Sequence, residues 1–339
     1  MRNLIKHPVA FCGALFFFFL FSSCNHDEST DSASKETVLL SVSVTGITES
    51  DENTEITRNN SNDSHQQMIT TIPLGNNIAM EATMTRNTAI TRATTVLAAE
   101  VRYRVIAFKK GKVNSMGYIN HCDYVAGTTG TAPEFILPAG VTYTFVCYSF
   151  NTTKALPAFN KNALDIAANP VTSDLLYAKF DKTITATDKA LSFSFVPKFS
   201  EVTVVADATG LKKNISDIST YLSPNYSATL AVSTGELTSS GTATAHAIPW
   251  GTIAAAQTVT SNTCMMFTNA SSAMTINIPS ITIEGVTRTG LTARFSSTTM
   301  QPGNKYTLIL AFKGESTPAG VLEDEWATKD SILNGGIQY

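Results

Sequence analysis

VTYTFVCYSF, residues 141–150, has apolar residues at both odd and even positions. Successive side chains of a strand point to opposite faces, so a run that is apolar at both odd and even positions has an apolar surface on each side. Such a strand is central in its sheet and is covered on both faces. The turn residues Pro138, Ala139 and Gly140 precede it, after the short run 134–137. The segment therefore predicts the middle of a β-sheet.

Strand patterns continue from this segment in both directions, whereas helix patterns are rare. Only 211–222 has apolar residues at helical spacing, and it lacks convincing caps. The other strand candidates are 69–84 as a hairpin, 96–108, 175–180, 191–196, 201–206, 227–233, 264–268, 274–284, 291–295 and 305–312. Short strands separated by many turns predict an all-β fold. We expect two antiparallel β-sandwich domains, at 37–190 and 191–315, and a tail at 316–339.

The first strand of the folded body is expected at 37–45. Its apolar side chains alternate with mostly polar ones, which predicts one buried face and one largely wet face. The buried face consists of Val38, Leu40, Val42 and Val44. A polar linker without periodicity follows at 48–67, and a stretch of that length inside a compact domain is typically functional or disordered.

Residues 1–23 have the pattern of a bacterial lipoprotein signal peptide. Basic residues precede an apolar run, 9–21, that is too short to span a bilayer. Small residues before Cys24 form a lipobox, although Phe21 stands where Leu is usual. We expect cleavage there and lipid on Cys24; an ordinary secretory signal with an incidental cysteine is the alternative. Residues 24–36 are then a polar tether.

Composition and charge exclude some classes of partner. The chain has 339 residues, of which 15% are charged, with a net charge of −3 and a pI near 6.0. A protein that binds nucleic acid needs a basic surface, so this balance argues against a nucleic-acid partner. Beyond the leader, no apolar stretch approaches the length of a membrane-spanning helix.

The cysteines and histidines do not form a recognisable reactive site. Cys147 lies in a strand pattern and is expected to be a buried, small apolar residue, while a bridge between Cys122 and Cys264 is left open. His121, Cys122 and Asp123 are adjacent, and neighbours on a strand point to opposite faces, so together they cannot hold one metal. No motif of a nucleophile, a phosphate loop or a zinc protease occurs in a suitable context. We therefore predict no metal, no cofactor and no enzymatic activity.

Five segments together resemble the fimbrillin family of the Bacteroidetes. They are 91–113, 137–157, 174–180, 191–206 and 300–312, in the family's order. The resemblance covers residues 37 to about 315. It implies transthyretin-like β-sandwiches and a structural or adhesive role in a type V-like pilus, with other pilus subunits as partners. The acids Asp27 and Glu28 after the lipobox resemble the signal that sends lipoproteins of this group to the outer surface of the outer membrane.

The resemblance also implies a mechanism of assembly. In fimbrillins an Arg-specific protease removes the first strand after export, and the C-terminal strand of a neighbouring subunit fills the groove. Here Arg92 matches the family position best, Arg58 lies in the most exposed linker, and Arg86 is the third candidate. The alternative is that all three are solvated loop residues. Apart from 331–339, the acidic tail is a poor donor strand.

A surface glycan-binding lipoprotein of a polysaccharide-uptake system is the alternative function. It needs exposed aromatic side chains that stack on sugar rings. Trp250 lies between Pro249 and Gly251, a position that suits either a loop platform or half-buried packing, and Trp326 lies in the tail.

Overall fold

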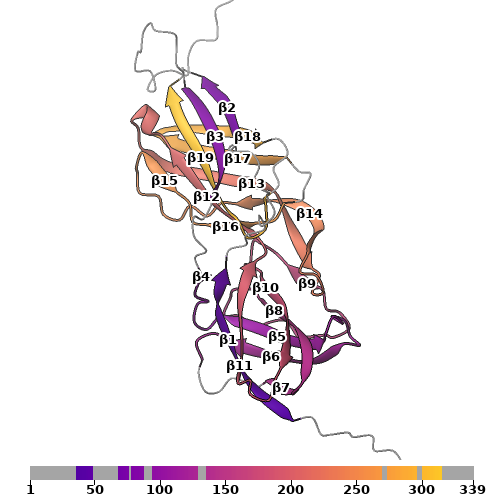
Figure 1. Ribbon diagram of the computed structural model, residues 1–339. Coiled ribbons are helices and arrows are strands. Elements are labelled where there is room, and N and C mark those ends of the chain that lie inside the picture. The colour runs from indigo at the N-terminus through magenta and orange to yellow at the C-terminus, as the bar shows by residue number, and fades with distance from the viewer. Residues whose placement is uncertain are drawn as a thin grey trace, which may run out of the picture. The chain divides into compact units, whose positions relative to one another are not determined.

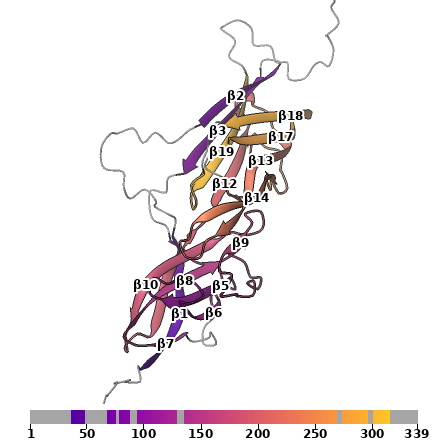
Figure 2. The same ribbon diagram turned by 90° about the vertical axis from the view of Figure 1, so that its right-hand side faces the viewer.

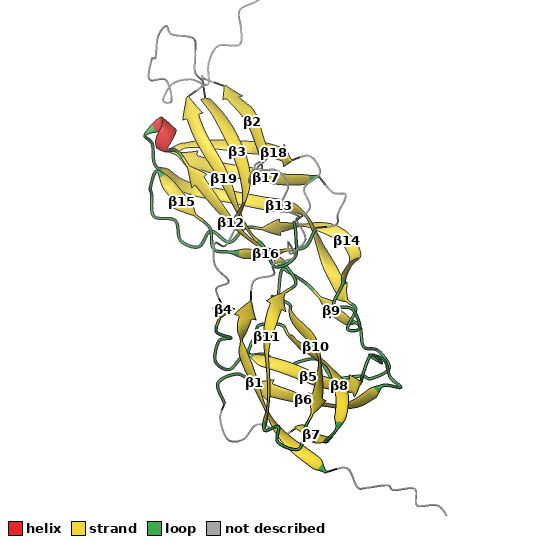
Figure 3. Cartoon of the chain, in the orientation of Figure 1, coloured by secondary structure: helices red, strands yellow, loops and turns green. Residues whose placement is uncertain are grey.

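The computed structural model describes residues 36–48, 68–75, 78–87, 94–128, 135–268, 273–295 and 300–314. The regular structure in these residues is β-strand, apart from one short 3-10 helix, η1 (Thr209–Leu211) (Figure 3). The prediction of an all-β fold is confirmed. The strands form three sheets.

The first sheet has eight strands and contains the run that is apolar on both faces. Its strands are β1 (Thr37–Thr48), β4 (Thr94–Thr95), β5 (Arg102–Lys109), β6 (Tyr118–Val125), β7 (Phe135–Pro138), β8 (Val141–Ser149), β10 (Leu176–Ile184) and β11 (Ala190–Pro197). Their order is β4-β1-β11-β10-β8-β5-β6, and β7 pairs with β1 (Figure 1). Phe145 and Cys147 of β8 pack into one core, and Val146 and Tyr148 into another. Strand β8 is therefore central and covered on both faces, as predicted.

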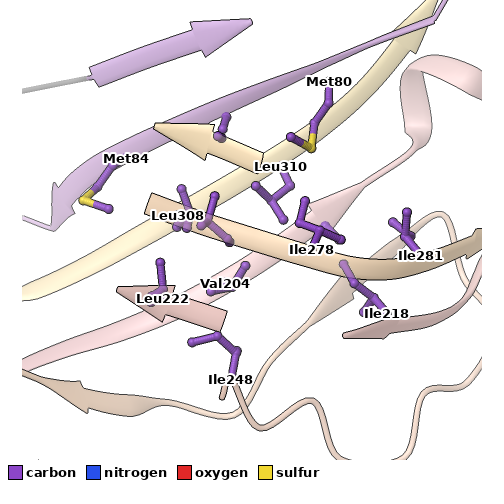
Figure 4. Packing of buried hydrophobic residues seen from close by; sticks show 14 of the residues in the cluster. Met80, Met84, Val204, Ile218, Leu222, Ile248, Ile278, Ile281, Leu308 and Leu310 are labelled. Carbon is purple, nitrogen blue, oxygen red and sulfur yellow. The ribbon is translucent and has the colours of Figure 1, made fainter. Parts of the chain in front are cut away.

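The other two sheets share one core. The six-stranded sheet contains β2 (Met68–Gly75), β3 (Ile78–Asn87), β12 (Ser200–Asp207), β15 (Thr258–Thr260), β16 (Cys264–Met266) and β19 (Lys305–Gly314). The five-stranded sheet contains β9 (Ile166–Ala168), β13 (Ile215–Leu230), β14 (Leu237–Ala247), β17 (Met274–Ile283) and β18 (Val286–Phe295). Met80 and Leu308 from the first gather with Ile218 and Ile278 from the second in one buried cluster (Figure 4). Two sheets packed through their apolar faces in this way form a β-sandwich.

Sheet membership does not follow the order of the chain. Strands β2 and β3 come directly after β1 in the sequence, yet β3 pairs with β19, and the two lie side by side in Figures 1 and 2. Strand β11 instead pairs with β1 and β10 in the first sheet. The predicted domain limits, 37–190 and 191–315, stay a prediction, because pairing says which strands are neighbours and not where a domain ends.

The strand predicted at 96–108 begins later than expected. Residues 96–101 form a loop, and β5 starts at Arg102. The cause is a turn in which Glu100 has a φ of 67° and its N–H donates to the carbonyl of Ala126 (2.9 Å). A left-handed residue ends an extended run, so the segment is a loop in which Val96 is exposed while Leu97 and Val101 still pack into the core.

The helix candidate at 211–222 is also wrong. Beyond η1 this segment enters β13, where Ile215, Ile218 and Leu222 are all buried. An odd spacing such as 215 to 218 would place two side chains on opposite faces of a regular strand. A β-bulge between Ile215 and Asp217 shifts the register, so both face the same core. The bulge thus imitates a helical pattern in the sequence.

Candidate functional site

Strand β1 pairs with three other strands of the first sheet, β7, β11 and β4. Its first half, Thr37 to Leu40, runs antiparallel to β7, whereas Ser41 to Ile47 runs parallel to β11. At its end, Ile47 and Thr48 pair with the two residues of β4. The strand therefore links β7 and β11, each of which pairs with a different half of it.

The inward side chains of β1 differ along its length. Val38 and Leu40 are buried in the core of the first sheet. Val42 and Val44 are half-buried and pack against the same core. The predicted alternation of faces is thus present, with the deepest burial at the end that pairs with β7.

The outward side chains of β1 hold it to β11 by hydrogen bonds. Ser43 Oγ lies 2.8 Å from Ser192 Oγ, and Thr45 Oγ1 donates to the carbonyl of Phe193 (3.0 Å). After Val44 the register shifts at Gly46, which has a φ of 148°. A Cβ there would lie 2.4 Å from Thr94 Cγ2, so only glycine lets β4 approach. These contacts are all non-covalent.

Of the residues predicted as sites of lipidation or processing, only Arg86 lies in the described part of the chain. Cys24, Arg58 and Arg92 lie outside it. Arg86 belongs to β3 and is paired with Tyr306 of β19. Its Nη2 donates to Asn304 Oδ1 (3.0 Å). A protease needs an extended, accessible backbone, so cleavage at Arg86 requires β3 to leave this ladder.

The face of β5 that carries the buried Ile106 and Phe108 also carries a buried arginine, which the sequence analysis did not single out. Arg104 donates to both carboxylate oxygens of Asp123 on β6, with 2.7 Å from Nη2 to Oδ2. Its Nη1 donates to Tyr148 Oη (2.8 Å) and to the carbonyl of Pro157 (2.9 Å). The guanidinium also lies over the ring of Phe159. Arg104 thereby fastens the loop after β8 to the sheet.

Burial alone would lower the pKa of the Arg104 guanidinium, but the hydrogen bond to Asp123 and the charges of Tyr148 and Asp123 outweigh it and raise that pKa. A signal for this residue was present in the sequence. Arg104 shares its face of the strand with Ile106 and Phe108, and both are buried. A cation on an apolar face predicts a buried partner.

The three neighbours on β6 point to different surroundings. His121 Nδ1 lies 2.8 Å from Tyr118 Oη, and its ring lies 4.1 Å from that of Phe159. Burial, and then the charge of Arg104, lower the pKa of His121. Cys122 packs against the opposite core, as expected for adjacent residues of a strand. No group of three or more metal-ligating side chains occurs in the described ranges.

The cysteines and Trp250 have structural surroundings. Cys122, Cys147 and Cys264 are free thiols, so the bridge between Cys122 and Cys264 that was left open is absent. Cys147 is fully buried, as predicted. Trp250 is 9% exposed, and its Nε1 donates to Thr220 Oγ1 (2.9 Å). It packs in the sandwich core and offers no platform for a sugar ring; Trp326 lies outside the described residues.

The fold and the site define an all-β protein of packed sheets. Its first strand, β1, belongs to one sheet, while the next strands in the chain, β2 and β3, belong to another. The family model described as fimbrillin-like matches residues 91–326. The chain therefore belongs to the fimbrillin-like family. Membership supports a structural or adhesive role in fimbriae and a place at the cell surface. Within the described residues, no helix has the length and apolar character that a membrane crossing needs.

Several solved structures are similar to the chain. A candidate cell adhesion protein from Bacteroides uniformis is 15% identical, with a TM-score of 0.44, covering 64% of this chain and 87% of the other. One from Bacteroides fragilis is 15% identical, with a TM-score of 0.43, covering 70% and 91%. The fimbrial anchor protein Mfa2 from Porphyromonas gingivalis is 12% identical, with a TM-score of 0.34, covering 61% and 97%. No curated protein matches the chain. The assignment rests on the family match.

Proposed function

We propose that the chain is made as a lipid-anchored precursor and becomes a component of a type V-like pilus, which joins neighbouring subunits by strand addition. Cys24 carries the lipid and holds the precursor on the outer membrane at the cell surface. Strand β1 is the element that leaves, and the C-terminal strand of another subunit takes its place. Family membership supports the fimbrial part of this proposal.

The position of β1 is the observation that carries the assembly step. Its contacts with β7, β11 and β4 are non-covalent, and the next strand in the chain, β2, belongs to another sheet. Loss of β1 would leave the backbone groups of β7 and β11 without partners. It would also uncover the pockets of Val38 and Leu40, each worth roughly 1.5–3 kcal/mol when filled. An incoming strand would recover both contributions.

The position of the cut decides what leaves together with β1. A cut after Arg58 would free β1 alone. A cut after Arg92 would leave β1 covalently joined to β2 and β3, and β3 pairs with β19 from Lys305 to Gly314. Release after Arg92 would therefore also open the six-stranded sheet, which favours Arg58 on structural grounds, although Arg92 matches the family position better.

N-terminal mass spectrometry of protein from intact cells tests this proposal. The precursor should begin at lipid-modified Cys24. Assembled protein should begin at Asn59 or Ala93 and should run as a ladder of multimers that resist detergent, because an added strand is held like a native one. Arg58→Lys and Arg92→Lys, compared with each other, identify the cut. Multimers built wholly from chains that keep residues 37–48 would rule out strand replacement.

A further inference from the structure

The outer face of the first sheet carries two exposed apolar side chains next to each other. Leu39 of β1 and Ile136 of β7 are directly opposite in the antiparallel pair, and they are 48% and 54% exposed. Opposite residues of such a pair have Cβ atoms about 4.5–5.5 Å apart, so the two side chains form one apolar patch. Strand addition depends on the buried side chains of β1 and makes no use of this patch.

The face around the patch is uncharged and its hydroxyl groups already have partners. Alternate residues from 37 to 45 in β1 and from 190 to 196 in β11 point outward, and in these two strands every one of them is uncharged. The hydroxyls of Ser41, Ser43 and Thr45 form hydrogen bonds to groups at the start of β11 and just before it. Polar groups that hold partners within the protein lose little when water leaves them. The face therefore suits a partner that is in part apolar.

The patch lies close to the point where the chain enters the folded body. Leu39 comes three residues after Glu36, and the carbonyl of Glu36 accepts a hydrogen bond from the N–H of Ala139, which follows β7 (2.7 Å). Cys24, which carries the lipid in the proposed precursor, comes twelve residues before Glu36. At 3.3–3.6 Å per residue, a fully extended connection of that length reaches about 40 Å. The patch is thus on the part of the body that the tether holds nearest to the bilayer.

We propose that, in the lipid-anchored precursor, this patch rests on the outer membrane with Leu39 and Ile136 inserted among the lipid headgroups. The inference rests on the proposed function, because it needs the lipid on Cys24. Apolar side chains at the boundary between headgroups and acyl chains contribute to binding in proportion to the apolar area that they bury. Two side chains make only a weak contact in free solution, but a short flexible tether gives a roughly millimolar effective concentration, at which a weak contact is occupied.

Processing would end this contact at the same time as the anchoring. A cut after Arg58 separates both Cys24 and Leu39 from the rest of the chain, while Ile136 stays behind on β7. The patch therefore exists only before processing. The first sheet is held against the membrane in the precursor and is free of it once β1 has left.

Fluorescence quenching by spin-labelled lipid tests this contact in the full lipidated chain. Ile136→Cys is labelled with a nitrobenzoxadiazole fluorophore in a Cys122→Ser background, because Cys122 is half-buried whereas Cys147 and Cys264 are buried. The vesicles contain phosphatidylethanolamine, phosphatidylglycerol and a phosphatidylcholine that is spin-labelled at its headgroup. The spin label should lower the fluorescence roughly twofold or more, since an inserted side chain lies within about 5–10 Å of the headgroup boundary.

Val171→Cys, labelled in the same way, is the matched control. Val171 is 52% exposed and precedes β10, whereas Ile184 at the other end of β10 accepts a hydrogen bond from the N–H of Gly140, just after β7. Strand β10, nine residues or roughly 30 Å long, thus lies between the control and the patch. The fluorophore at position 171 should not be quenched. Leu39→Ser should reduce the quenching at position 136 about twofold, because it removes half of the patch.

Three outcomes would overturn the inference. Equal quenching at positions 136 and 171 would show that the patch does not touch lipid. Cross-linking of two copies through the thiol at position 136, without quenching by lipid, would assign the patch to a second copy. Mass spectrometry of the purified protein first shows whether Cys24 carries lipid, and absence of the lipid would refute the anchoring as well. Lipid on Cys24 without quenching at position 136 would refute the membrane contact alone and leave the proposed function intact.

Discussion

Leu40 of β1 and Phe135 of β7 lie directly opposite each other in an antiparallel pair, and both are fully buried. The next pair along the same two strands, Leu39 and Ile136, points outward and is 48% and 54% exposed. One step along the strand therefore separates a core contact from a surface contact between similar apolar side chains.

This arrangement predicts very different effects for two adjacent leucines. Leu40→Ala should lower the free energy of unfolding by about 2–5 kcal/mol, because it empties a filled core position. Leu39→Ala, the matched control, should change it by no more than about 0.5 kcal/mol. Urea unfolding of the uncut chain measures both. Equal effects would mean that β1 does not pack into the core, and the strand-addition proposal would lose its support.

The bond between Arg104 and Asp123 predicts a larger effect than an exposed ion pair. Asp123→Asn should cost about 1.5–3 kcal/mol, since an amide NH2 cannot accept, so one hydrogen bond from the buried cation is lost and the other is weakened. Glu81→Gln removes the exposed pair with Lys313 (2.7 Å) and should cost about 0–1 kcal/mol. Thermal melts of the two variants provide the comparison. A smaller loss for Asp123→Asn than for Glu81→Gln would contradict the role assigned to Arg104.

Asp188, in the turn between β10 and β11, predicts a loss of stability in acid. The Thr185 N–H and hydroxyl donate to its carboxylate, and together with Lys182 they hold the pKa of Asp188 down to about 2. A depressed pKa stabilises the folded state above the unfolded value near 4, and this contribution fades as the pH falls toward 2. Melting temperatures at a series of pH values should show the parent above Asp188→Asn at neutral pH, with the gap closing in acid. A gap that does not change with pH would refute this assignment.

Asp174 predicts the opposite pH dependence. Its pKa is raised by burial, and then by Glu201, above the unfolded value near 4. The folded state then binds the proton more tightly, so stability decreases as the pH rises from about 4 through the folded pKa. Asp174→Asn should therefore melt higher than the parent at pH 7 and alike in acid. A lower melting temperature at pH 7 would assign the carboxylate a structural role.

The strands that the sequence predicted correctly were predicted from the spacing of apolar residues close together in the chain. The two-sided apolar run of β8 and the alternation of β1 are properties of neighbouring residues, because a strand turns successive side chains to opposite faces. Local spacing was misleading at Ile215 and Ile218, because a β-bulge between them places both side chains on the same face of the strand. It also missed Arg104, whose partner Asp123 lies on another strand.

The all-β class, the burial of Val38 and Leu40, and membership of the fimbrillin-like family all follow from the amino-acid sequence. The parallel pairing of β1 with β11, where Ser43 meets a serine 149 residues away, is visible in the folded chain alone. The same holds for the pairing of β3 with β19 and for the hollow that both Asp174 and His246 line. Such pairings depend on which distant edges and faces remain free when the sheets pack, and that choice is a property of the whole fold rather than of any short segment.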